Sequence, residues 1–272
     1  MKKILILGGT GMLGNATSKY FRQNENYETW STFKTEKFSV GDRTLFFDPF
    51  INFNLLENIL KDFDYVINCL GIINKFVDGN EEDTIRINSI FPRMLADLCN
   101  SENIRLIHIT TDCVFSGKKG LYTEEDSHDA WDFYGKSKSL GEPNNCMVLR
   151  TSIIGKEIHK KVGLIEWAIS MRDKDINGFT NHIWNGLTTK QYSKCCDKII
   201  SNDLYEESVF HIFSNIVTKY ELTKFFNSKW NLNLKVNSFE TSEGIDRTLS
   251  TIKELNGKLN IPSIENQIRE IE

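Results

Sequence analysis

Short apolar stretches alternate with stretches that place apolar residues at helical spacing along the first half of the chain. The predicted strands are 3–7, 27–32, 65–70, 105–110 and 147–152, and the predicted helices are 13–23, 54–61, 88–100 and one beginning near Phe133. Alternation of this kind favours βαβ units and a parallel sheet. Residues 65–69 form a continuous apolar run, which is typical of a strand covered by helices on both faces. The pattern therefore predicts a doubly wound α/β sheet of the Rossmann type.

The pattern loosens after residue 155. The expected elements there are a helix at 163–171, a turn-rich segment at 177–187, a helix at 190–200, a strand at 209–214 and a polar, helical tail. We expect residues 1–155 to form the sheet domain, completed by segments near 188–215, and residues 156–272 to form a smaller C-terminal part. The four prolines and the lack of a Gly/Ser-rich stretch indicate no flexible linker, so the two parts should pack together.

The composition is that of a soluble globular protein that binds small molecules. The 272 residues are 40% hydrophobic and 26% charged, with a net charge of -4 and no long single-sign run. We therefore expect neither nucleic acid nor a membrane as a partner, and the oligomeric state stays open, a homodimer included. The first apolar run is too short for a signal peptide, which predicts a cytoplasmic protein. The six cysteines lack metal-ligand spacing, so we expect them reduced and expect no metal site.

A glycine-rich loop follows the first predicted strand directly. The segment from Gly8 to Gly14 reads GGTGMLG, a GxxGxxG pattern between a strand and a helix. Glycines at these positions permit a tight turn, close approach to a pyrophosphate and close helix–sheet packing, and the helix N-terminus favours negative charge. The loop therefore predicts a dinucleotide site. Its predicted coenzyme contacts are Gly8, Thr10, Gly11, Met12, Leu13 and Gly14.

The end of the second predicted strand bears on which dinucleotide binds. A carboxylate there would hold the ribose hydroxyls of NAD, whereas Ser31, Thr32 and Lys34 suit the additional phosphate of NADP. We therefore predict NADPH as the coenzyme, and Glu36 leaves NADH open. Further coenzyme contacts are predicted where later strands end, at Asp48, Cys69, Leu70 and Gly71.

Two later segments carry residues suited to reducing a carbonyl group. Thr111 follows the strand at 105–110, and Tyr134 and Lys138 form a YxxxK pattern that places both side chains on one helix face. A nearby ammonium and an oxidised nicotinamide would stabilise the tyrosinate, so Tyr134 could donate a proton to a carbonyl oxygen. Lys138 would also bind the nicotinamide ribose, and Thr111 would hold the substrate oxygen. We predict these three as the catalytic residues, with Tyr134 and Lys138 also contacting the coenzyme.

These segments together resemble the extended short-chain dehydrogenases/reductases, and most closely the dTDP-4-dehydrorhamnose reductase branch. The residues that carry the resemblance are 8–14, 107–117, 134–142 and 149–152, so it covers about the first 155 residues, with weaker support at 178–180 and 185–189. It implies NADPH-dependent reduction of the 4-keto group of a nucleotide-linked 6-deoxyhexulose, in the synthesis of cell-surface polysaccharide or glycan precursors. It also makes residues 1–155 the NADP-binding domain and 156–272 mainly the substrate-binding part.

Cys113 departs from this branch, which usually carries an aromatic residue after the Thr–Asp pair. The cysteine form resembles a sub-branch associated with UDP-linked 2-acetamido-2,6-dideoxyhexuloses. A 4,6-dehydratase would carry Asp-Glu after the catalytic threonine, and here Asp112 precedes Cys113.

Two other functions stay open. One is a bifunctional epimerase-reductase, in which Cys113 would act with His159 or His182. The other is an NADPH-binding sensor without chemistry.

Substrate contacts are expected beside the catalytic residues and in the second half. The predicted set is Asp112, Cys113, Val114, Asn181, Trp184 and Arg247. Arg247 and Lys219 are the cations expected to face a nucleotide diphosphate. Trp184 is expected to stack on a base or sugar or to belong to the core.

Overall fold

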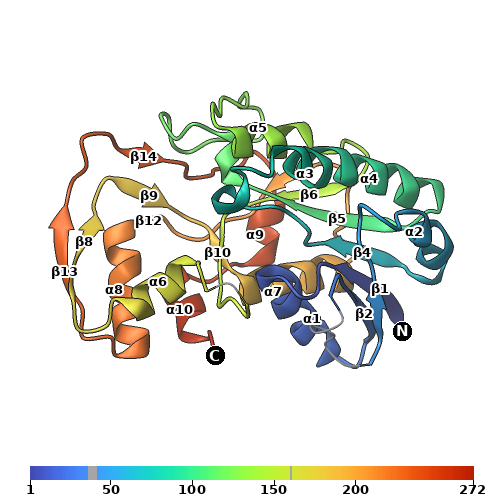
Figure 1. The fold of residues 1–272 in the computed structure, drawn as a ribbon, viewed down its shortest axis with the longest axis horizontal. Coiled ribbons are helices and arrows are strands. Elements are labelled where there is room, and N and C mark those ends of the chain that lie inside the picture. The colour runs from blue at the N-terminus through green and yellow to red at the C-terminus, as the bar shows by residue number, and fades with distance from the viewer. Residues whose placement is uncertain (36–41, 160) are drawn as a thin grey trace.

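A seven-stranded parallel sheet forms the centre of the molecule in the computed structural model, which describes residues 1–35, 42–159 and 161–272 (Figure 1). In spatial order its strands are β11 (Val209–His211), β6 (Met147–Arg150), β5 (Arg105–Thr110), β4 (Tyr65–Asn68), β1 (Lys2–Leu7), β2 (Tyr27–Phe33) and β3 (Thr44–Phe46). The chain reverses its direction of progress across the sheet between β1 and β4. In open α/β sheets, ligands bind at such a switch point, outside the carboxyl ends of the strands. The predicted doubly wound Rossmann-type fold is confirmed.

Helices cover both faces of this sheet (Figure 1). One face carries α1 (Met12–Arg22), α7 (Thr189–Ser201) and α9 (Leu255–Leu259). The other carries α2 (Asn54–Ile59), α3 (Glu81–Ile85), α4 (Phe91–Ser101) and α5 (Phe133–Leu140), together with the short helical turns η2 (Leu60–Asp62), η3 (Asn74–Phe76), η4 (Arg86–Ile90) and η5 (Asp112–Val114). The helix expected at 88–100 is therefore longer than predicted, and η4 is a π-helical turn within it.

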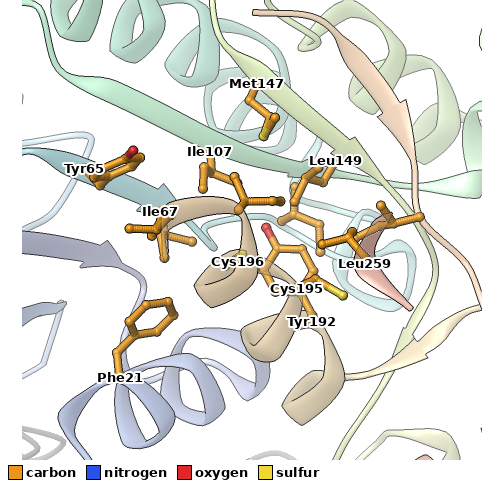
Figure 2. Close-up of a cluster of buried hydrophobic side chains, with 14 of the residues drawn as sticks. Phe21, Tyr65, Ile67, Ile107, Met147, Leu149, Tyr192, Cys195, Cys196 and Leu259 are labelled. Carbon is orange, nitrogen blue, oxygen red and sulfur yellow. The ribbon is translucent and has the colours of Figure 1, made fainter. Parts of the chain in front are cut away.

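Two hydrophobic clusters bind the helices to the sheet. Figure 2 shows one of them, where Phe21 of α1 and Tyr192 of α7 face Ile67 and Ile107 of the strands. Cys195 and Cys196 are fully buried in this cluster, and the structure contains all six cysteines as free thiols. Full burial of a large apolar side chain stabilises a fold by about 1.5–3 kcal/mol.

A smaller group of elements extends beyond the large sheet, on the left in Figure 1. Its strands are β7 (Ile153–Ile154), β8 (Asp175–Phe179), β9 (His182–Trp184), β10 (Leu187–Thr188), β12 (Val217–Thr218), β13 (Lys235–Phe239) and β14 (Ile245–Asp246), and its helices are α6 (Leu164–Ser170), α8 (Lys219–Trp230) and α10 (Ile264–Arg269). A separate hydrophobic cluster fills the space between α6, α8 and α10. Between these elements the chain returns to the large sheet as α7 and β11.

Strand order within this smaller group brings distant residues together. β9 pairs with β12 on one side and with β14 on the other. The beginning of α8 and the end of β14 therefore lie beside β9. Among the described helices, none is long and apolar enough to cross a membrane.

Candidate active site

The glycine loop between β1 and α1 is closely packed on the side that faces the protein. Gly8 has a φ of +81°, and its N–H donates to the Thr32 hydroxyl at 2.9 Å. A Cβ on Gly14 would lie 2.1 Å from the Gly8 carbonyl oxygen, so only glycine lets α1 approach this closely. A Cβ on Gly11 would meet only that oxygen, at 3.4 Å. The loop is thus tight at Gly8 and Gly14 and open at Gly11.

The open side of the loop suits an anion. Gly11 is the N-cap of α1 and supplies no capping side chain, so the first turn presents backbone N–H groups at its N-terminus. Leu13 is buried and packs into the hydrophobic cluster, whereas Thr10 and Met12 are half-buried at the loop surface. This cradle fits a pyrophosphate, because a side chain at Gly11 would occupy the space that the phosphates need.

The end of β2 packs against the glycine loop. Ser31 is fully buried and its hydroxyl accepts a hydrogen bond from Arg22, while Thr32 is 2% exposed and bound by Gly8. Both side chains are buried and hold the loop, and their contact with a phosphate stays a prediction. Lys34 is an exposed cation at this edge.

Lys34 forms an ion pair with Asp48, whose carboxylate also accepts the Phe50 N–H. The Lys34 Nζ lies 3.1 Å from the Asp48 Oδ2 and 5.0 Å from the centre of the Phe50 ring. The two charged groups therefore lie side by side where β2 and β3 end. Glu36 lies outside the described residues.

The end of β4 turns at Cys69, Leu70 and Gly71. Burial raises the pKa of the Cys69 thiol to about 12, so it is a neutral thiol. Asn88, in the π-helical turn η4, exchanges two 2.8 Å hydrogen bonds with the Ile72 backbone. Sequence analysis missed Asn88, because no local pattern marks a π-helical turn.

The three predicted catalytic side chains meet at the carboxyl end of β5. Thr111 follows β5 directly, and its hydroxyl is a hydrogen-bonding neighbour of the Tyr134 phenol. The Lys138 Nζ donates to the Ile109 carbonyl oxygen at 3.3 Å. It would lie 3.9 Å from a Cβ on Gly71, so the ammonium sits between the ends of β4 and β5.

The electrostatics of this group are dominated by burial. Burial raises the pKa of Tyr134 well above its usual range, and the neighbouring Cys113 raises it further, while Thr111 opposes the shift. Burial lowers the pKa of Lys138 to about 8, against the effect of Glu142. The predicted lowering of the Tyr134 pKa by Lys138 is therefore not found among the chain's own residues. At neutral pH the phenol is a neutral proton donor, and the Lys138 amine, one helical turn further along α5, is mainly charged.

Residues from the second half face this group. Asp112 is buried, and burial raises its pKa, while Arg247 and Lys219 oppose that rise. Lys219 begins α8, and its Nζ lies 4.9 Å from the centre of the Trp184 ring. Burial, Lys219 and Arg247 together lower the pKa of His182. Two cations and a carboxyl group therefore gather next to the side chains that are predicted to be catalytic.

Two of the predicted substrate residues lie in the core rather than at a surface. Val114 is fully buried, and Trp184 is 4% exposed beneath Lys219. Packing covers both side chains in this structure, and for Trp184 this fits the alternative expectation that it belongs to the core; their contact with a substrate stays a prediction. Asn181 is half-buried and bound to Thr241, and the Arg247 Nε donates to the Phe115 carbonyl oxygen at 2.9 Å.

Cys113 is half-buried next to Asp112, to whose Oδ1 its thiol donates at 3.6 Å. Burial, and next the Asp112 carboxylate, raise the pKa of this thiol to about 12. His159, one of its two proposed partners, has an exposed side chain.

Comparison with known proteins identifies the family. The family model described as RmlD substrate binding domain matches residues 1–247, so the chain belongs to this family. Methionine adenosyltransferase 2 subunit beta from Pongo abelii is 26% identical over 254 residues, covering 85% of this chain and 73% of the relative. dTDP-4-dehydrorhamnose reductase from Aggregatibacter actinomycetemcomitans is 30% identical over 164 residues, covering 56% of this chain and 51% of the relative. The resemblance found in the sequence is confirmed at the level of the family.

The fold extends over the whole chain of a solved relative. A dTDP-4-dehydrorhamnose reductase from Bacillus anthracis, crystallised in complex with NADP, superimposes with a TM-score of 0.81 at 21% identity. The match covers 100% of this chain and 98% of that one. The smaller group of elements therefore belongs to the shared fold as fully as the large sheet does.

Proposed function

We propose that this chain is a reductase that uses NADPH, or alternatively NADH, to reduce the 4-keto group of a nucleotide-activated 6-deoxyhexulose. The observation that carries the proposal is the convergence of Thr111, Tyr134 and Lys138 at the carboxyl ends of β4 and β5, beside the open glycine loop. Membership of the RmlD family and the NADP bound to the Bacillus anthracis reductase support it.

The proposed chemistry divides between coenzyme and protein. When bound, the reduced coenzyme supplies hydride to the carbonyl carbon. Tyr134, neutral because of its burial, donates its proton to the carbonyl oxygen. Thr111 donates a hydrogen bond to the same oxygen as negative charge develops there. The Lys138 ammonium stabilises the tyrosinate that remains, and proton return from solvent completes the cycle.

The cations of the second half suit the anionic end of such a substrate. Lys219 is half-buried and Arg247 is anchored through its Nε to the Phe115 backbone, so both are held in place beside Asp112. Charge-assisted hydrogen bonds from arginine and lysine are strong phosphate contacts. We therefore propose residues 156–272 as mainly the substrate-binding part, with a UDP-linked 2-acetamido-2,6-dideoxyhexulose as the favoured sugar. Such activated sugars are precursors of surface polysaccharides and glycans.

The test is turnover of defined sugars. Purified protein with NADPH or NADH is given UDP-, dTDP-, GDP- and CDP-linked 4-keto-6-deoxy sugars, and loss of the reduced coenzyme absorbance is followed. Tyr134→Phe should lower any turnover by about 10²–10⁴, and Tyr205→Phe, far from the site, serves as the matched control. Absence of turnover with every sugar would refute the reductase proposal for this set.

A second candidate is a coenzyme-binding subunit without catalysis. It is favoured by the similarity to methionine adenosyltransferase 2 subunit beta, which extends over 85% of this chain. This candidate predicts coenzyme binding without oxidation of the coenzyme by any sugar of the panel. The three catalytic side chains argue for turnover, so we rank the reductase first.

An epimerase-reductase is less well supported by the geometry. A thiol whose pKa is raised to about 12 is a poor base at neutral pH, because almost none of it is thiolate. Exchange of sugar C3 or C5 hydrogens with deuterated solvent would reveal epimerisation, and a Cys113→Ser variant should then abolish it.

A further inference from the structure

A buried arginine joins the helix that carries Tyr134 and Lys138 to the sheet. Arg150 ends β6 and is 2% exposed. Its Nε and Nη2 donate to the two carboxylate oxygens of Glu142, at 3.1 and 2.7 Å, two residues beyond the end of α5. This two-point contact is the strong geometry for an arginine–carboxylate pair.

Two histidines complete the surroundings of this guanidinium. The Arg150 Nη2 lies 2.8 Å from the Nε2 of His128, and its Nη1 lies 2.6 Å from the Nε2 of His211. The Phe115 ring packs against the guanidinium, with its centre 5.2 Å away. Three side chains thus approach Arg150 from the segment before α5, from the segment after α5 and from β11.

The hydrogen bonds define the protonation state of both histidines. A guanidinium only donates, so both Nε2 atoms must accept and both imidazoles must be neutral, with the proton on Nδ1. The other partners agree independently, because the Nδ1 of His211 lies 2.7 Å from the Ser250 carbonyl oxygen, which can only accept. The Nδ1 of His128 lies 2.6 Å from the hydroxyl of Ser139, a residue of α5.

We propose that Arg150 and His128 are positioning residues, which hold α5, and with it Tyr134 and Lys138, against the sheet only while the His128 imidazole is neutral. The contact runs from Ser139 in α5 through His128 to Arg150, and back through Glu142 to the end of α5. The expected effect on catalysis rests on the proposed function. The expected effect on the position of α5 rests only on the contacts described above.

Protonation of His128 would break this arrangement. The His128 Nε2 would then carry a proton and a positive charge 2.8 Å from the Arg150 Nη2, which is also a charged donor. Glu142, 3.7 Å from the His128 Nε2, would then compete with Arg150 as the partner of His128. The charged groups that face His128 are therefore Arg150 from β6, Glu142 from the end of α5 and Asp129 from its own loop. Those that face His211 are Arg150 and Glu124.

The direction of the pH effect follows from burial. Burial lowers the pKa of His128, and burial with Arg150 lowers that of His211 to about 4. The folded protein therefore binds these protons less readily than the unfolded chain does. The stabilisation is complete above the usual histidine pKa of about 6.5 and is lost as the pH falls. The His128 side chain is 25% exposed and His211 is fully buried, so His128 is the first to be protonated.

The first experiment needs neither coenzyme nor substrate. Amide hydrogen exchange of α5 is compared between about pH 7.5 and 5.5 in the native chain and in His128→Gln, with α1 as the internal reference helix. The Gln carbonyl keeps an acceptor for Arg150 but does not titrate. We expect the protection of α5, corrected for intrinsic exchange, to fall about tenfold more on acidification in the native chain than in the variant, in which His211 still titrates but residue 128 does not. If the protection of α5 changes equally in the two proteins on acidification, or changes in neither, the proposal is overturned.

The second experiment uses turnover. Arg150→Lys keeps the charge but loses the planar fork, so we expect kcat to fall about tenfold or more, with KM and coenzyme affinity within about twofold. Arg105→Lys, at the opposite end of the sheet, is the matched control. We also expect the acid limb of the kcat profile to move to lower pH in His128→Gln, a variant that keeps the Arg150–Glu142 pair. An unchanged acid limb or an unchanged kcat contradicts the positioning role, whereas no turnover by the native chain contradicts only the proposed reductase.

Discussion

Alanine substitutions at two glycines of the loop should separate its structural from its binding function. At Gly14, a Cβ would stand 2.1 Å from the Gly8 carbonyl oxygen and 2.6 Å from its carbon, which are backbone atoms that cannot rotate away. Overpacking of this kind costs about 1–3 kcal/mol. At Gly11, the nearest atom would lie at 3.4 Å, an ordinary contact, and φ is -78°, which alanine adopts freely.

The two variants are therefore expected to fail in different assays. Gly14→Ala should lower the free energy of unfolding by about 1–3 kcal/mol and weaken coenzyme binding as the loop shifts. Gly11→Ala should leave stability within about 1 kcal/mol but weaken NADPH binding at least tenfold, about 1.4 kcal/mol, because its methyl group enters the space for the pyrophosphate.

Denaturant unfolding without coenzyme and a fluorescence titration with NADPH measure the two quantities separately. Gly257→Ala is the control, since its Cβ would meet nothing within 4 Å in α9 and should stabilise that helix by about 0.5–1 kcal/mol without changing affinity. If Gly11→Ala binds NADPH as tightly as the native chain, the loop does not hold a pyrophosphate. If Gly14→Ala has the same midpoint denaturant concentration of unfolding as the native chain, a Cβ at position 14 does not disturb the packing.

Four further outcomes are expected from single substitutions around the site. Tyr134→Phe should lower kcat by about 10²–10⁴ with unchanged coenzyme affinity in a titration. Lys138→Met should remove a rise in unfolding free energy between about pH 8 and 10.5, because in that range the unfolded chain holds the lysine proton that the folded chain has lost; denaturation across this range measures it. Lys34→Ala should lower the preference for NADPH over NADH about tenfold, seen as the ratio of the two Kd values. Arg247→Met should raise KM for the nucleotide sugar about tenfold and change kcat less, in steady-state kinetics.

The fold and the position of Thr111, Tyr134 and Lys138 at the strand ends could be predicted because their signals are local. The glycine loop is seven consecutive residues after a strand, and Tyr134 and Lys138 are one helical turn apart. Thr111 stands directly after a strand whose carboxyl end must point to the site in a parallel sheet. Each of these inferences needs only the neighbouring residues and the direction of the strands.

Burial of individual side chains could not be predicted in the same way. Ser31 and Thr32 have the hydroxyls that a phosphate contact needs, but the glycine loop packs so closely on β2 that a Cβ on Gly9 would lie 2.8 Å from Ser31. The same close approach that suits the loop to a dinucleotide covers these hydroxyls. Trp184 is likewise covered by elements that follow it in the chain, and no local pattern reports them.

The contacts that join distant segments are the part that sequence reasoning cannot reach. Lys219 and Arg247 are 28 residues apart, and they face Asp112 together because β9 pairs with β12 on one side and with β14 on the other. Arg150 likewise contacts His128, which precedes it in the sequence, and His211, which follows it. Both arrangements depend on strand order in three dimensions. The C-terminal part therefore supplies Lys219 and Arg247 to the proposed active site, whereas Arg150, at the end of β6, is proposed to position α5 from within the large sheet, which is why substitutions at Arg247 and Arg150 should change KM and kcat respectively.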